Sequence, residues 1–243
     1  MTQFYSKNTN SINGIIDVPG DKSISQRVLI LGSVSIGITR IKGISPSEDV
    51  NNLISNLKLL GVNIKKKENF TEVSGVGIGG LSSTKKALYM GNSGTATRLL
   101  LGMLCNQNFE TKLTGDTSLT KRNMKKIITP LKQMGVKINS LNNKLPIVIH
   151  GFNETMPIIY NQKTPSAQIK SAVLLASLNS PGETTIIENT PTRNHTEILL
   201  KTLGAKIKIR KSNKKKIIKI TGQKELIAKN ILIGGDPSSA AIV

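Results

Sequence analysis

The stretch LKLLGVNIKKKENFTEVSG (Leu57–Gly75) has two further copies in the chain, LKQMGVKINSLNNKLPIVIHG (Leu131–Gly151) and TLGAKIKIRKSNKKKIIKITG (Thr202–Gly222). In each copy an amphipathic helix ends at a glycine, which adopts the left-handed conformation of a helix C-terminus without a Cβ penalty. Alternating apolar and polar residues then predict a strand, and a second strand follows a turn rich in lysine and asparagine. We therefore expect three copies of a helix followed by a β-hairpin.

A second shared block precedes each copy and consists of an almost wholly apolar helix followed by a strand. The apolar helices are SISQRVLILGSVSIG (Ser23–Gly37), GTATRLLLGMLC (Gly94–Cys105) and SAQIKSAVLLASL (Ser166–Leu178). Their expected starts at Ser23, Thr95 and Ser166 lie 72 and 71 residues apart. A helix that is apolar on all sides is buried. The sequence thus predicts an α/β fold of repeated βαβαββ units around three buried parallel helices.

The two ends of the chain fit none of the three units. Residues 1–20 form a strand-like piece with no evident partner, and the tail GGDPSSAAIV (Gly234–Val243) begins a new helical pattern. We expect residues 21–234 to form one complete domain, with units at about 21–90, 91–160 and 161–234. We also expect the sequence to be truncated.

The charge of the chain raises the hypothesis of a basic nucleic-acid-binding module. There are 34 lysines and arginines against 14 aspartates and glutamates, a net charge of +20. However, the chain has four phenylalanines, three tyrosines and no tryptophan, which is few for base stacking. Lysine runs such as Lys65–Lys67 and Lys214–Lys216 fall in expected hairpin turns. A solvated basic surface is therefore the favoured interpretation.

Other classes of protein are disfavoured by composition. No apolar run approaches the roughly 20 residues of a membrane span, and the N-terminus lacks the apolar stretch of a secretory signal. The single cysteine, Cys105, excludes an internal disulfide and a cysteine-rich metal site. We expect a cytoplasmic protein that uses no metal.

The first turns of the apolar helices carry the residues most suited to binding. They read PGDKSISQR (Pro19–Arg27), GNSGTATR (Gly91–Arg98) and TPSAQIK (Thr164–Lys170). A helix N-terminus offers free N–H donors and a partial positive charge, which suit an anion. The cations Lys22, Arg27 and Arg98 lie in these turns. Simple capping stays open, since Ser23 and Gln26 match a capping box, but three cationic starts favour a shared phosphate or carboxylate site.

The positions of the arginines point to the same ends of the helices. Arginine grips phosphate and carboxylate bidentately, and four of the six arginines lie at the start of a helix. Arg27 and Arg98 begin apolar helices, whereas Arg122 and Arg193 precede outer helices. His195 beside Arg193 either caps its helix or supports that arginine, whereas His150 ends a strand and is expected to be structural.

These motifs resemble those of the 5-enolpyruvylshikimate-3-phosphate (EPSP) synthase family of enolpyruvyl transferases. GDKSISQR, GNSGTATRLL, TGDTSLTKR, PSAQIKSAVLLASL, TRNHTE and GDPSSAA occur in that order, and the resemblance covers essentially the whole chain. It implies a protein roughly twice as long, with two domains of three units. Residues 1–20 and 235–243 would then be fragments of the first domain, and 21–234 the complete second domain.

The resemblance implies a reaction and a set of substrates. The family transfers the enolpyruvyl group of phosphoenolpyruvate to the 5-hydroxyl of shikimate 3-phosphate, by addition and elimination, and releases phosphate. It uses no cofactor, and we expect a monomer with no nucleic-acid or membrane partner. The residues for proton transfer would lie beyond Val243, so we expect this chain alone to be inactive.

The resemblance also implies the binding residues. Shikimate 3-phosphate would contact Lys22, Ser23, Arg27, Ser166, Ala167, Gln168 and Arg193. Phosphoenolpyruvate would contact Lys22, Gly94, Arg122 and Gln168. The sister enolpyruvyl transferase acting on a UDP-sugar is the nearest alternative. It usually has asparagine after the first lysine and a reactive cysteine in a loop, whereas here Ser23 follows Lys22 and Cys105 lies in an apolar helix.

Overall fold

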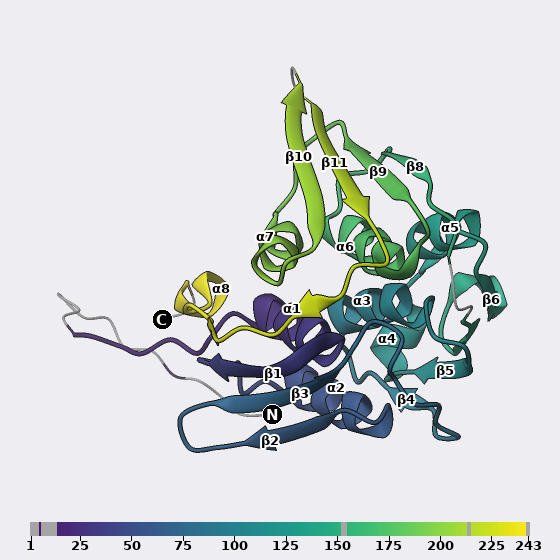
Figure 1. Ribbon diagram of the computed structural model, residues 1–243. Helices are drawn as coiled ribbons and strands as arrows, with labels where there is room; N and C mark the ends of the chain where they lie inside the picture. Colours follow the sequence, from purple (N-terminus) through teal and green to yellow (C-terminus); the bar gives the residue numbers. More distant parts are fainter. Residues whose placement is uncertain (1–4, 6–13, 152–154, 213–214, 242–243) are drawn as a thin grey trace.

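Three central helices organise the structure, a computed structural model that describes Tyr5 and residues 14–151, 155–212 and 215–241. These helices are α1 (Lys22–Ser33), α3 (Gly94–Leu104) and α6 (Ala167–Ala176), and they lie between three sheets (Figure 1). Helix α3 contacts both α1 and α6. A Cβ built on Gly102 of α3 would lie 2.3 Å from the carbonyl oxygen of Ala172 on α6, so glycine permits this close approach. The predicted α/β fold around three buried helices is confirmed.

The second and third sheets repeat one strand order. The second is β4 (Leu88–Tyr89), β5 (Glu110–Thr114), β7 (Ile147–His150) and β6 (Lys137–Ser140). The third is β8 (Ile159–Gln162), β9 (Glu183–Glu188), β11 (Lys215–Thr221) and β10 (Lys206–Ser212). In both, the first strand is parallel to the strand that follows the central helix, and the last two strands form an antiparallel hairpin.

The first sheet differs in the origin of its parallel strand. Strands β1 (Ser35–Lys42), β3 (Thr71–Val76) and β2 (Asn63–Lys66) follow the common order, but β1 pairs in parallel with β12 (Leu226–Ile227) and β13 (Ile231–Leu232). The chain therefore returns after the third unit to complete the first sheet. The second and third units are consecutive βαβαββ units, as predicted. The first unit differs, because its leading strand comes from residues 226–232.

The two ends of the 21–234 segment run side by side. The backbone N–H of Asp21 donates to the carbonyl oxygen of Gly234 at 3.0 Å, and that of Asp236 donates to Pro19 at 2.8 Å. Gly20 and Gly235 form an antiparallel bridge. Figure 1 shows the purple N-terminal segment and the yellow helix α8 (Pro237–Ala240) leaving the molecule on the same side.

Outer helices cover the central ones. Helix α2 (Glu48–Leu59) contacts α1, α5 (Lys125–Gln133) contacts α6, and α7 (His195–Thr202) contacts α1. The glycines that follow them, Gly61, Gly135 and Gly204, have φ of +87°, +89° and +88°, as predicted for helix C-termini. Short elements complete the fold: helix α4 (Thr117–Lys121) and the 3₁₀ turns Leu141–Asn143 and Ser177–Asn179.

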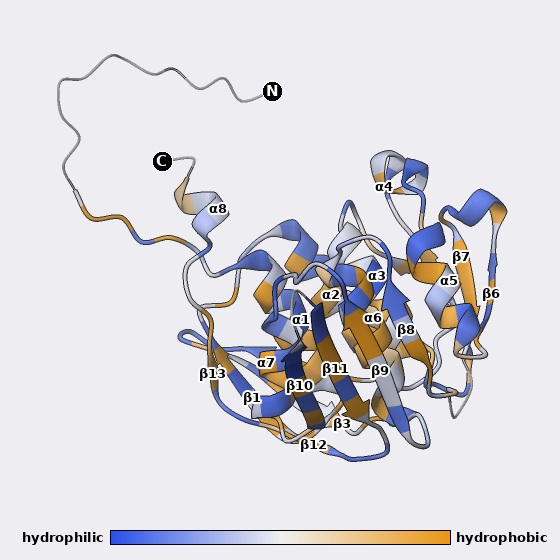
Figure 2. Ribbon diagram, turned by 90° about the horizontal axis from the view of Figure 1, so that it is seen from above, coloured by the Kyte–Doolittle hydropathy of each residue, from blue (hydrophilic) through white to orange (hydrophobic). Residues whose placement is uncertain are grey.

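The core lies around the central helices. Val28, Leu29, Leu99, Leu100 and Leu174 have no exposed surface, and Figure 2 shows hydrophobic colour on α6 and on the strands β9 and β11 beside it. No helix in the described part of the chain is long and apolar enough to cross a membrane.

Two expected element positions differ from the structure. The first central helix ends at Ser33 and β1 begins at Ser35, so residues expected to be helical belong to a strand. Lys216 lies within β11 with 7% of its surface exposed, not in a solvated turn. Its neighbour Lys214, expected in the same turn, lies outside the described residues.

Candidate functional site

Each central helix starts at a side-chain cap. Asp21 Oδ1 accepts from the N–H of Ile24 at 2.7 Å, and Ser93 Oγ accepts from that of Ala96 at 3.2 Å. Ser166 Oγ accepts from the N–H of Ile169 at 3.3 Å. The helix starts expected at Ser23 and Thr95 are wrong by one residue, because these helices begin at Lys22 and Gly94 and are capped by Asp21 and Ser93.

Side-chain hydrogen bonds join the three helix starts. The capping box of Ser23 and Gln26, which the sequence left open as an alternative, is not formed, because Gln26 Nε2 donates to Ser93 Oγ, the cap of α3, at 2.8 Å. From α6, Gln168 Nε2 donates to Thr95 Oγ1 at 2.7 Å, and Gln168 Oε1 accepts from Arg98 Nη1 at 2.9 Å. The partial positive charges of three helix N-termini therefore meet within the reach of single side chains.

Adjoining cavities open at this meeting point. One of about 440 Å³ is lined by Ser23, Arg27, Pro165, Ser166, Ala167, Gln168, Thr192, Arg193 and His195. One of about 350 Å³ is lined by Lys22, Asp49, Asn92, Gly94, Thr95, Arg98, Arg122 and Gln168. A third, of about 490 Å³, shares Lys22, Ser23 and Arg193 with them and extends to Asp236 and Ser238 of the C-terminal segment. These cavities are lined by all nine binding residues that the family resemblance implies: Lys22, Ser23, Arg27, Gly94, Arg122, Ser166, Ala167, Gln168 and Arg193.

Arg27 is the most deeply placed cation of the first cavity. It is 5% exposed, its Nε donates to Thr196 Oγ1 at 2.9 Å, and its Nη1 donates to the carbonyl oxygen of Ser23 at 2.8 Å. Burial lowers the pKa of Arg27 below its ordinary value; Asp21 and Glu197 oppose this shift, and Arg193 adds to it. An anion in the cavity would compensate the desolvated charge.

The second cavity brings together two more guanidinium groups and Lys22. Arg122 Nη2 donates to Asn92 Oδ1, and Arg98 Nη1 donates to the carbonyl oxygen of Gly94 at 2.9 Å. Burial, and then the nearby charge of Arg122, lower the pKa of Arg98. A Cβ on Gly94 would lie 2.6 Å from Arg98 Nη1 and 3.1 Å from Arg122 Nη1, so glycine makes room for both groups.

Sequence reasoning missed two residues of this cavity. Asp49, in the first turn of α2, pairs with Lys22 Nζ at 3.0 Å, and no motif marks it. Asn92, the partner of Arg122, belongs to the quoted motif GNSGTATR, so a signal for it was present. The Lys22 side chain is still 47% exposed and remains accessible to a ligand.

The two histidines differ in their relation to the site. His195 lines the first cavity, and burial together with the charge of Arg27 lowers its pKa below 6.5. It is the first residue of α7, whose cap is Asn194, so the capping interpretation is wrong. His150 lies in the second sheet, where Nδ1 is 3.0 Å from Glu110 Oε2 and Nε2 is 3.0 Å from Asn139 Nδ2.

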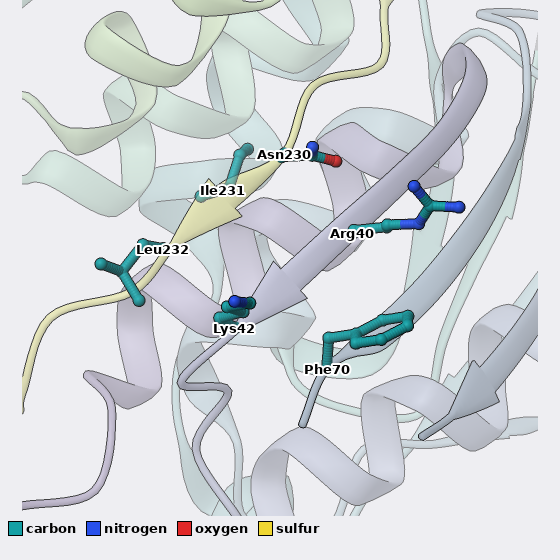
Figure 3. A pocket seen from close by; sticks show the side chains of 6 residues that line it. All are labelled: Arg40, Lys42, Phe70, Asn230, Ile231 and Leu232. Carbon is teal, nitrogen blue, oxygen red and sulfur yellow. The ribbon is translucent and has the colours of Figure 1, made fainter. Parts of the chain in front are cut away.

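A separate pocket of about 430 Å³ lies on the first sheet and is lined by Arg40, Lys42, Phe70, Asn230, Ile231 and Leu232 (Figure 3). Arg40 pairs there with Glu72 at 3.0 Å. Its lining comes from strands and their connections, without the convergent helix N-termini of the other cavities. Among the described residues, no group of three or more histidine, cysteine, aspartate or glutamate side chains could hold a metal ion.

Comparisons with known proteins agree with this geometry. The family model described as EPSP synthase (3-phosphoshikimate 1-carboxyvinyltransferase) matches residues 6–243. The 3-phosphoshikimate 1-carboxyvinyltransferase of Streptococcus mutans is 44% identical over 236 residues, which are 96% of this chain and 54% of that protein. The one from Bartonella henselae is 46% identical over 232 residues, 95% of this chain and 52% of that protein.

A solved structure extends the likeness to three dimensions. The EPSP synthase from Acinetobacter baumannii matches with a TM-score of 0.85 at 40% identity, over 94% of this chain and 51% of that one. The chain thus spans about half the length of the curated relatives it matches. With this match to the family over nearly all of its own length, the chain belongs to the EPSP synthase family.

Proposed function

We propose that the chain forms the shikimate 3-phosphate-binding half of an EPSP synthase. The whole enzyme would transfer the enolpyruvyl group of phosphoenolpyruvate to the 5-hydroxyl of shikimate 3-phosphate and release phosphate. The observation that carries the proposal is the meeting of three helix N-termini in adjoining cavities lined by cations. Both substrates carry phosphate and carboxylate groups, and such a site binds both kinds of anion.

The first cavity is proposed to hold shikimate 3-phosphate. Arg27 and Arg193 would pair with its charged groups, and the hydroxyls of Ser23 and Ser166 would donate to their oxygens. Ala167 is the first residue of α6, so its backbone N–H is one of the donors that a helix start leaves unused.

The second cavity is proposed to hold phosphoenolpyruvate between Arg122, Lys22 and the backbone at Gly94. Gln168 lines both cavities and would contact both substrates. Two substrates bound in adjoining cavities are oriented for reaction, which converts an encounter in solution into a step within one complex. In this proposal the described residues bind, orient and neutralise charge, and proton transfer belongs to the half of the relatives that the chain does not span. We expect the chain alone to be inactive.

The proposal extends to organisation and surroundings. Residues 21–234 would be one domain and the flanking residues parts of another, which the pairing of Gly20 with Gly235 supports. We propose a cytoplasmic monomer whose partners are its two small substrates, without nucleic acid.

The enolpyruvyl transferase acting on a UDP-sugar is not favoured. Its reactive cysteine lies in a loop, whereas Cys105 is fully buried at the end of α3 and burial raises the pKa of its thiol. A buried neutral thiol is a poor nucleophile.

Calorimetric titration of the chain with shikimate 3-phosphate tests the proposal. We expect saturable binding to one site. Shikimate should bind at least about a hundredfold more weakly than its 3-phosphate, because the phosphate supplies charge-assisted contacts of about 3 kcal/mol. Binding of double-stranded DNA, if any, should fall steeply with salt, as for a nonspecific basic surface. Equal affinity for shikimate and its 3-phosphate would overturn the proposed site.

A further inference from the structure

A buried ion-pair cluster lies directly behind the first cavity. Lys170 on α6, Glu188 at the end of β9 and Glu197 on α7 have no exposed side-chain surface, and Lys216 on β11 has 8%. Lys170 Nζ lies 3.0 Å from Glu188 Oε1 and 2.8 Å from Glu197 Oε1. Lys216 Nζ lies 2.8 Å from Glu197 Oε1 and 3.7 Å from Glu188 Oε2. Figure 1 shows the four elements packed together above α1.

The cluster holds the backbone that carries Arg193. Lys170 Nζ donates to the carbonyl oxygen of Arg193 at 3.0 Å. One residue earlier, the N–H of Thr192 donates to Glu188 Oε1 at 3.2 Å, and its hydroxyl donates to the same oxygen. The segment between β9 and α7 is thus fixed at two successive residues, just where the Arg193 side chain enters the cavity.

The contacts of Lys170 separate a positioning role from direct binding. An ammonium has three donors, and Lys170 faces three acceptor groups in Glu188, Glu197 and the Arg193 carbonyl. Since it is fully buried and its donors are engaged, it has nothing left for a ligand. Two lysines and two glutamates also sum to zero charge, so the cluster does not attract an anion through its net charge.

The desolvation cost of the four buried ions also favours a positioning role for the cluster. Desolvating four ions opposes folding, and replacing a whole buried ion-pair cluster by apolar residues of similar volume often leaves stability unchanged or higher, whereas removing a single partner lowers it. Glu197 Oε2 even lacks a hydrogen-bond partner among the described residues. What the ions supply and an apolar side chain does not is a set of directional bonds to the backbone of Thr192 and Arg193.

We propose that Lys170 and Glu188 are positioning residues, which fix the Thr192–Arg193 backbone so that the Arg193 guanidinium faces shikimate 3-phosphate. This inference rests on the proposed function of the first cavity. Arg193 is an exposed side chain on a connecting segment. Without the contacts from Lys170 and Glu188, the segment would have to become ordered when the ligand binds, and this loss of conformational entropy would weaken binding. Lys170 thereby acts on affinity through Arg193 alone.

A double-mutant cycle with shikimate 3-phosphate as the probe tests this coupling. We expect Lys170→Met to weaken binding about tenfold, equivalent to about 1.4 kcal/mol, and no more than Arg193→Ala does. In the Arg193→Ala background, the same Lys170 substitution should change affinity by less than about twofold. The matched control is Lys216→Met, which removes an ammonium from the same cluster but none of the contacts to Arg193 or Thr192. It should lower stability while leaving affinity within about threefold.

Amide hydrogen exchange supplies a readout that needs no ligand. The Thr192 amide should exchange faster in Lys170→Met than in Lys216→Met, because only the former loosens the segment that Glu188 holds. If Lys170→Met does not fold, Thr192→Val replaces it in the cycle, since it removes one donor to Glu188 at a half-buried position.

The outcomes separate the two proposals. A wild-type chain that binds no shikimate 3-phosphate refutes the proposed function. In that case, hydrogen exchange at the Thr192 amide still tests whether Lys170 and Glu188 hold the Thr192–Arg193 backbone. A wild-type chain that binds, with equal losses from Lys170→Met in the presence and absence of the Arg193 side chain, overturns the positioning role. Equal exchange at Thr192 in Lys170→Met and the wild type overturns it as well.

Discussion

Replacement of Arg27 by alanine is the sharpest single perturbation of the proposed phosphate-binding cavity. A guanidinium carries five N–H donors, and two of those of Arg27 donate to Thr196 and to the Ser23 carbonyl. The others can serve a ligand in the cavity that Arg27 lines. Removing a charge-assisted contact to a desolvated anion costs about 2–5 kcal/mol. Because the cavity is open to solvent, we expect the lower part of that range, about 2–3 kcal/mol, or roughly 30- to 150-fold in affinity.

The assay is calorimetric titration with shikimate 3-phosphate, accompanied by thermal unfolding of each variant. Arg27→Lys keeps the charge but not the planar fork, so it should recover only part of the loss. Arg210→Ala is the matched control, because Arg210 is an exposed arginine on strand β10, away from the cavities. It should change affinity by less than about twofold. Equal losses of affinity in Arg27→Ala and Arg210→Ala would show that only the net charge of the chain affects binding, and would contradict a direct contact of Arg27 with the ligand.

Three further expectations follow from particular contacts. NMR titration should give His195 a pKa below 6.5, because burial and the charge of Arg27 disfavour its charged form. The unfolded chain then binds the proton more tightly than the folded chain, so the free energy of unfolding should fall as pH drops through about 6.5. An unchanged or raised pKa of His195 would contradict this prediction. Gly94→Ala should weaken phosphoenolpyruvate binding about tenfold in the presence of shikimate 3-phosphate, since its methyl displaces the Arg98 and Arg122 guanidinium groups; a large loss of thermal stability would instead mean that the glycine serves the helix start. Leu29→Ala, at a fully buried position, should cost about 2–5 kcal/mol in urea unfolding, whereas Leu232→Ala, at a position 77% exposed, should cost less than about 0.5 kcal/mol.

Repetition in the sequence predicted what is local and periodic. The glycines at 61, 135 and 204 marked three helix ends, and each has the expected positive φ. Apolar helices of near-constant spacing predicted a buried core of three helices. These features depend on residues close in sequence, where the spacing of apolar residues and glycines indicates the local secondary structure.

Pairings between distant residues were not predictable in the same way. Strands β12 and β13 have two residues each, too few to show a period, and they pair with β1 across most of the chain. The bond between Gln26 and Ser93 spans 67 residues, and it replaces the local capping box that the sequence pattern of Ser23 and Gln26 allowed. Local signals compete with tertiary contacts, and at these positions the tertiary contact wins.

The buried ion-pair cluster was only partly predictable from the sequence. A lysine inside SAQIKSAVLLASL, a helix apolar on nearly every side, must find an acidic partner when buried. The sequence does not say which of 14 acidic residues that is. Lys216 was assigned to a turn because lysine runs usually are solvated, whereas the strand pairing of β11 places it opposite Glu188.

A crystal structure of the chain with shikimate 3-phosphate is the most direct test of the proposed substrate site. We expect one molecule in the cavity lined by Ser23, Arg27, Ser166 and Arg193. Its phosphate oxygens should lie within about 3 Å of serine hydroxyls or of the backbone N–H of Ala167 at the start of α6. Shikimate 3-phosphate bound elsewhere, for example in the pocket beside Phe70 on the first sheet, with the helix starts unoccupied, would contradict it.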